Sequence, residues 1–197
     1  TLVMKYTKDP GRSEGDDYAR VYNITVAKKL VAVGSEAFSG CTALKTVILG
    51  DCVDALGDKA FYQCSSLQEI VIPNSVKSVG SYCFSGCSAM KNVVIGDGLT
   101  NIKEYTFADC GLKNILIGDN ITSIGNYAFK GCTRMKSAVL GNGLTVINGT
   151  MFNGCIGLED VEFGNNIREL KTNAFSGCSS LFTITIPPTV TTVGDNV

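Results

Sequence analysis

The hydrophobic positions of this chain recur with a period of 22 or 23 residues. A phenylalanine followed three places later by a cysteine occurs seven times, and the interval between repeats is 23 residues except once, where it is 22. Seven matches in register indicate an internal repeat. The repeat is the strongest indication of the fold in this sequence. The paired positions are Phe38 and Cys41, Phe61 and Cys64, Phe84 and Cys87, Phe107 and Cys110, Phe129 and Cys132, Phe152 and Cys155, and Phe175 and Cys178.

Each repeat carries the same series of structural signals. A Leu or Met follows the cysteine, and then comes a β-rich triplet such as Val-Ile-Leu at 47–49 or Ile-Leu-Ile at 115–117. Gly or Pro closes the triplet, and two more apolar positions follow, as at Val76 and Val79. The triplets predict short strands, and the second apolar pair predicts shorter extended pieces on the opposite side. Small and polar residues around each phenylalanine predict a tight helical turn, so we expect little regular α-helix.

A unit of this length cannot bury a core by itself, and it suits one coil of a solenoid that stacks on its neighbours. Equivalent positions of successive coils would then lie about 4.8 Å apart, as in a parallel sheet. We therefore expect a β-rich solenoid over residues 24–197 and an N-terminal cap hairpin over residues 1–23. The sequence ends one residue before the next phenylalanine would fall, so we expect a longer parent protein.

Two stretches carry a resemblance to a known family: LQEIVIPNSVKSVGSYCFSGC at 67–87 and ILIGDNITSIGNYAFKGC at 115–132. They resemble the BspA-like, or Treponema-pallidum-type, leucine-rich repeat, although this chain often has Gly where the family has Pro after the strand. The resemblance implies a right-handed leucine-rich-repeat superhelix. It also implies an extracellular or cell-surface location and a role in adhesion or other binding, because such proteins are commonly secreted or surface proteins of host-associated microbes.

The recurring cysteine allows three interpretations: a disulfide framework, a metal site or a structural ladder. A metal needs ligands that converge on one point, whereas a solenoid spreads its thiols along a line. Adjacent coils bring cysteine Cα atoms within disulfide range, but stacked side chains point the same way. The pattern therefore favours a ladder of small buried side chains. Cys83 replaces an alanine of other repeats and is expected to be buried, whereas Cys52 lies in a turn and is expected to be exposed.

Composition removes several classes of chemistry. The chain of 197 residues has no histidine, which excludes Ser-His and Cys-His catalysis and mixed Cys/His zinc sites. The net charge of −1 provides no general attraction for nucleic acid, and no apolar run is long enough to span a membrane. We expect a non-enzymatic, monomeric module without a cofactor.

Strand alternation directs the middle residue of each triplet outward. Five successive outward positions are aliphatic: Ile48, Val71, Val94, Leu116 and Val139. They run between a row of lysines, namely Lys45, Lys91, Lys113 and Lys136, and a row of aspartates, namely Asp51, Asp97 and Asp119. This arrangement predicts a binding face, and the alternative is that β-branched residues only stabilise neighbouring strands. A further row, Tyr82, Tyr105 and Tyr127, is expected to stack on the opposite side as surface cover.

These observations, together with the family resemblance, predict a surface or secreted recognition and adhesion module whose solenoid face binds a protein or glycan, with a host molecule as one candidate source. A passive spacer is one alternative. A repeat region of a larger enzyme is another. A binding face would be sensitive to charged substitutions, whereas a spacer would not be.

Overall fold

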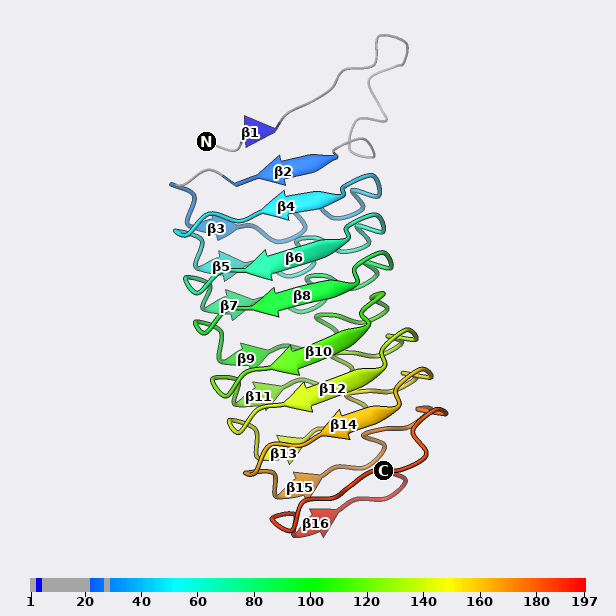
Figure 1. Cartoon of the computed structure of the whole chain (residues 1–197). Coiled ribbons are helices and arrows are strands. Elements are labelled where there is room, and N and C mark those ends of the chain that lie inside the picture. The colour runs from blue at the N-terminus through cyan, green and yellow to red at the C-terminus, as the bar shows by residue number, and fades with distance from the viewer. Residues whose placement is uncertain (1–2, 5–21, 27–28) are drawn as a thin grey trace.

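The computed structural model describes residues 3–4, 22–26 and 29–197, and it forms a β-solenoid of stacked coils (Figure 1). Within the described residues, each coil contributes a short strand to a back side, and each coil except the last contributes a longer strand to a front side. The front strands are β2 (Asn23–Thr25), β4 (Thr46–Ile48), β6 (Glu69–Ile72), β8 (Asn92–Ile95), β10 (Asn114–Ile117), β12 (Ser137–Leu140) and β14 (Asp160–Glu162). The back strands are β3 (Ala32–Val33), β5 (Ala55–Leu56), β7 (Ser78–Val79), β9 (Asn101–Ile102), β11 (Ser123–Ile124), β13 (Val146–Ile147), β15 (Glu169–Leu170) and β16 (Thr192–Val193).

Strand pairing follows the sequence repeat. Val71 of β6 is opposite Val94 of β8, and Leu116 of β10 is opposite Val139 of β12, so equivalent positions stack in parallel register. The described residues contain no helix, in agreement with the expectation of little regular α-helix. The predicted β-solenoid is confirmed.

The N-terminal cap hairpin was expected over residues 1–23. A short strand, β1 (Val3–Met4), pairs antiparallel with β2, the first strand of the solenoid. The rest of the predicted hairpin lies outside the described residues, so the hairpin stays a prediction.

The front strands do not form one continuous ladder. They divide into the groups β1-β2-β4, β6-β8 and β10-β12-β14. The break between β8 and β10 coincides with the single 22-residue interval, in which the loop after Cys110 is one residue shorter. Val93 and Ile95 of β8 face inward but are only half-buried, whereas Ile115 and Ile117 of β10 are buried.

The last β-rich triplet departs from the prediction. Residues 184–186 were expected to form a strand, but they have no strand assignment. Within the described residues this coil packs only on the coil before it, and Ile184 is partly exposed while Ile186 is exposed. The preceding Phe182 is 89% exposed. With packing on one side only in this structure, the triplet does not pair as the inner strands do.

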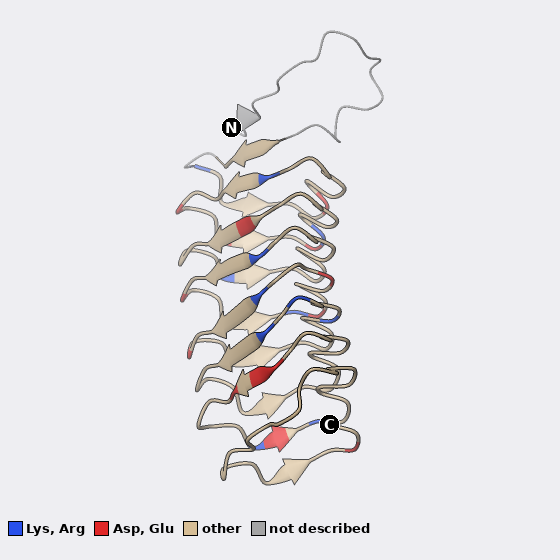
Figure 2. Cartoon of the chain, turned by 45° about the vertical axis from the view of Figure 1, so that its right-hand side comes forward, with Lys and Arg blue, Asp and Glu red and all other residues tan. Residues whose placement is uncertain are grey.

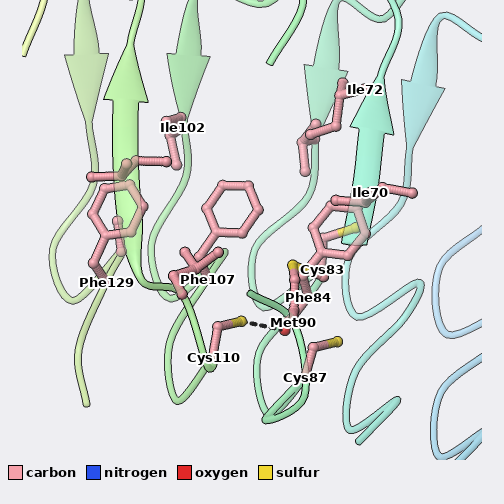
Figure 3. Close-up of a cluster of buried hydrophobic side chains, with 14 of the residues drawn as sticks. Ile70, Ile72, Cys83, Phe84, Cys87, Met90, Ile102, Phe107, Cys110 and Phe129 are labelled. Carbon is pink, nitrogen blue, oxygen red and sulfur yellow. Dashed lines mark hydrogen bonds between the residues drawn. The ribbon is translucent and has the colours of Figure 1, made fainter. Parts of the chain in front are cut away.

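The core is a column of phenylalanine rings that runs the length of the solenoid. Successive rings from Phe38 to Phe175 stack with centroids 5.4–5.8 Å apart, and all seven are buried. Figure 3 shows part of this column, with aliphatic side chains of the strands beside the rings. Offset aromatic stacking adds to the burial energy of each ring, so every coil is fixed to the next at its centre.

The bends that hold the phenylalanines are tight turns rather than helices. The amide of Phe38 donates to the carbonyl of Ala60 in the next coil (2.8 Å), and the amide of Phe61 donates likewise to that of Cys83 (2.8 Å). The residue two places before each phenylalanine has a positive φ of 54–64°. An α-helix needs both negative φ and hydrogen bonds to its own carbonyls, so the stacking of coils replaces helix formation here.

Candidate binding face

An aliphatic stripe runs across the front strands, and we call it the front stripe: Ile48, Val71, Val94, Leu116 and Val139. The first four are 61%, 57%, 57% and 69% exposed, and Val139 is half-buried. Their strand neighbours on each side point into the core, as the alternation predicted. Four large apolar side chains therefore face solvent in one row along the solenoid.

The lysine row lies at the start of the front strands, as Figure 2 shows. Lys45, Lys91, Lys113 and Lys136 are all exposed. Lys136 forms an ion pair with Glu159 of the next coil, and the Lys45 ammonium lies 5.8 Å from the ring centre of Tyr22. Gln68 and Glu69 interrupt the row at β6, so the positive edge is strongest from β8 to β12.

The aspartate row lies beyond the other end of the front strands, in the turns. Asp51, Asp97 and Asp119 are exposed. The carboxylate of Asp119 accepts a hydrogen bond from the amide of Asn142 (2.7 Å), and the Asn142 side-chain oxygen accepts one from the amide of Asn165 (2.9 Å). These side chains thus link successive turns, and the front stripe lies between a positive and a negative edge.

A groove opens on the front side between β4 and β6, where the strand ladder is interrupted. It has a volume of about 450 Å³, and Ile48, Val71 and Pro73 are among the residues that line it. Asp51 and Glu69 lie at its margin. Sequence reasoning missed this groove, because the β4 triplet has the same pattern as its neighbours.

The tyrosine row forms a stack where the back strands enter the bends. The rings of Tyr82 and Tyr105 lie 4.5 Å apart and those of Tyr105 and Tyr127 4.9 Å apart. Partial desolvation and the adjacent Tyr105 raise the pKa of Tyr82. The Lys130 ammonium lies 5.6 Å from the ring centre of Tyr127. The rings mostly cover one another, as the sequence suggested for this row.

The repeat cysteines are free thiols with a defined hydrogen-bond partner. The Cys110 thiol donates to the carbonyl of Phe84 in the preceding coil (3.1 Å), as Figure 3 shows, and five other repeat cysteines make the equivalent bond at 3.1–3.3 Å. Burial raises the pKa of Cys64 to about 12. Cys83 is buried and Cys52 exposed, both as expected. Within the described ranges, no group of three potential metal ligands converges.

The described residues include no helix of the length and apolar character that a bilayer crossing requires. A comparison with curated protein sequences gives no match.

Solved structures of three bacterial proteins are similar to this chain. The Treponema pallidum leucine-rich-repeat protein is 29% identical, with a TM-score of 0.68 over 87% of this chain and 77% of its own. A leucine-rich-repeat protein of Eubacterium ventriosum is 25% identical, with a TM-score of 0.56 over 86% of this chain and 40% of its own. The pneumococcal vaccine antigen PcpA shares the fold at 18% identity, with a TM-score of 0.63 over 91% of this chain and 55% of its own. This chain therefore spans about half the length of the last two.

The family model for the BspA type leucine-rich-repeat region matches residues 17–136 and 100–197, with six copies of the repeat. The two matches together cover the whole solenoid, including every coil with a Phe-Cys pair. This protein belongs to the BspA-type leucine-rich-repeat family.

Proposed function

We propose that this protein is a non-enzymatic recognition and adhesion module, secreted or at a cell surface, that binds a protein or glycan ligand through its front face. The observation that carries the proposal is the front stripe, in which four successive coils each expose a large aliphatic side chain. Family membership supports the location, since repeats of this type are common in secreted and surface proteins.

The front stripe has the composition of an interface centre. An exposed sheet face normally alternates to polar residues at these positions, because outward side chains do not contribute to the core. Side chains on β4, β6, β8 and β10 instead form an apolar patch on the order of 300 Å². In protein interfaces, such a centre contributes most of the binding energy and the charged rim contributes specificity.

The charged edges define which ligands suit the face. Lys91 and Lys113 lie on one side of Val94 and Leu116, and Asp97 and Asp119 lie on the other. A ligand with an apolar centre between an acidic and a basic edge would be complementary in both respects. Such a ligand would also be oriented along only one direction of the stripe, because reversing it would bring like charges together.

The experiment is a pull-down from extracts of candidate host cells, followed by the double substitution Val94→Glu with Leu116→Glu. Two carboxylates at the centre should abolish capture, because a desolvated charge without a partner is costly. Both side chains point away from the core, so the melting temperature should change little. Lys91→Glu should weaken capture less, and mainly at low salt.

A matched control places the same charges on the back side, through Thr100→Glu with Ser123→Glu at two exposed positions. This control should bind like the native protein. If the folded front-face variant binds as strongly as the control, the front stripe is not the binding site. The tyrosine row would then be the next surface to test, whereas a native protein that captures nothing would favour the passive-spacer alternative.

A further inference from the structure

A small polar cavity lies on the bends, away from the front stripe. It has a volume of about 390 Å³ and spans four coils, from Thr42 to Asp109. None of the residues that line it belongs to a front strand. We call it the bend pocket, and two departures from the repeat create it.

The first departure concerns the position two residues after each phenylalanine, where the backbone has a positive φ. Glycine occupies this position in five bends, but Gln63 and Asp109 occupy it in the other two, both with φ of 56°. Residues with a side chain are disfavoured in this conformation, and nothing in the core requires these two. Both residues line the bend pocket.

Gly86 lies between these two residues in the stack and leaves room for the Gln63 side chain. A Cβ at Gly86 would lie 3.1 Å from the Cγ of Gln63, so the glutamine lies over this glycine. The Asp109 carboxylate lies in the same way against Gly131 of the following coil, and Gln63 and Asp109 are two polar borders of the bend pocket.

The second departure is Tyr62, which lies in the bend pocket beside Gln63. Its equivalents in the adjacent coils are Ser39 and Ser85, so no aromatic ring from its own row covers either face. The side-chain amide of Gln63 donates a hydrogen bond to the Tyr62 hydroxyl (3.2 Å) and helps to hold the ring in place. Tyr82, Tyr105 and Tyr127 differ, because they stack on one another.

The lining suits one class of ligand. Thr42, Ser65 and Ser85 offer hydroxyl groups, Gln63 offers an amide, and Asp109 offers the single carboxylate, while no Lys or Arg lines the pocket. Such groups donate to and accept from ligand hydroxyls, and the carboxylate disfavours an anion. An aromatic face packs against polarised C–H groups. Combined, these features match the hydroxyl-rich edge and apolar face of a sugar ring.

We propose that the bend pocket binds a neutral hexopyranose unit of a glycan. This site is separate from the front stripe and does not depend on the function proposed for it.

The test uses saturation-transfer NMR with the methyl glycosides of glucose, galactose and mannose as probes. The native chain should transfer saturation to at least one of them. The double substitution Gln63→Gly with Asp109→Gly restores the residue that the other bends have and should reduce sugar affinity about tenfold or more. Tyr62→Ser, which copies the adjacent coils, should have a similar effect. All three substitutions introduce residues that other coils already have at the equivalent positions, so the fold should persist.

One control separates loss of this site from a general effect of substitution. Thr100→Glu with Ser123→Glu alters two exposed positions on the back side, which belong neither to the bend pocket nor to the front face, and should leave the sugar signal unchanged. The proposal is overturned if none of the three glycosides receives saturation, or if the signal persists when Gln63 and Asp109 are glycine.

Discussion

At the residue scale, the structure explains why the repeat uses cysteine rather than alanine after the phenylalanine. The carbonyl of Phe84 accepts the amide of Cys87 in its own coil (3.2 Å) and the thiol of Cys110 in the next coil (3.1 Å). A buried carbonyl has two lone pairs, and the weak S–H donor satisfies the second of them without introducing a strongly polar group. The sequence predicted that these thiols would be buried, but the bond between coils depends on backbone positions that no pattern of residues displays.

The burial of the thiols predicts their reactivity. Native protein should react with a thiol reagent at about one site, the exposed Cys52, with slower reaction at the half-buried Cys178. Denatured protein without reductant should react at all nine cysteines, and mass spectrometry gives the count. Several disulfides in the native protein would contradict the arrangement of free thiols.

The same burial predicts how stability depends on pH. Burial raises the pKa of Cys178 to about 11 and that of Cys64 to about 12, against about 8.5 for a thiol in an unfolded chain. Below pH 8.5 the thiols keep their protons in both the folded and the unfolded chain, and their burial contributes fully to stability. As pH rises above 8.5, the unfolded chain loses protons first, so the free energy of unfolding should fall by up to about 1.4 kcal/mol per pH unit for each such thiol.

Urea melts at pH 7.5, 8.5 and 9.5 measure this effect before most tyrosines and lysines titrate. Burial also raises the pKa of Cys83, and Ala60 and Ala128 already fill the equivalent position in other coils. Cys83→Ala should therefore fold well and show a smaller pH dependence than the native chain. An unfolding free energy that stays constant across this range would contradict the prediction.

At the scale of elements, the coil is held by its phenylalanine more than by its strands. The strands are two to four residues long, and two pairs of neighbouring front strands, β4 with β6 and β8 with β10, lack ladder pairing. The rings, in contrast, stack without a break from Phe38 to Phe175. The aromatic column therefore provides continuity across the places where the sheet is interrupted.

Phe107→Ala tests this assignment. Phe107 is fully buried between Phe84 and Phe129, so its truncation should cost about 3–5 kcal/mol in the free energy of unfolding. Lys113→Ala removes an exposed side chain and should change the value by no more than about 0.5 kcal/mol. Equal effects in denaturant melts would mean that the inner and outer positions are wrongly assigned.

The elements also show how far the sequence could predict this structure. Strand alternation correctly placed Ile48, Val71, Val94 and Leu116 outside, because side-chain direction in a strand depends only on position along the chain. The groove between β4 and β6 was not predictable, since it depends on how two coils with the same residue pattern are spaced. The bend pocket was missed because the sequence does not display the positive φ of Gln63 and Asp109. The structure shows this conformation, which glycine adopts at the equivalent position of the five other bends.

At the scale of the whole molecule, the solenoid distributes its properties by side rather than by segment. The net charge of −1 does not reveal that charges are separated on the surface. The front side has lysines along one edge and aspartates along the other. The front stripe between these edges and the pocket on the bends are both built from side chains of successive coils. A stacked architecture repeats any side-chain position along a line, so substitutions in adjacent repeats combine into one surface.

This architecture predicts that a complete coil can be removed. Deletion of residues 65–87, the 23 residues from one repeat cysteine to the next, joins Cys64 to Ser88 and keeps every later position in register. Each coil interacts mainly with its neighbours, so the shortened chain should fold, with the free energy of unfolding and its denaturant dependence both reduced by roughly a seventh. Deletion of residues 65–76 removes about half a coil, moves inward residues outward and should prevent folding. Circular dichroism and urea melts of the two variants distinguish these outcomes. If both deletions unfold the chain equally, the coils are not the interchangeable units that their stacked phenylalanines and thiol bonds indicate.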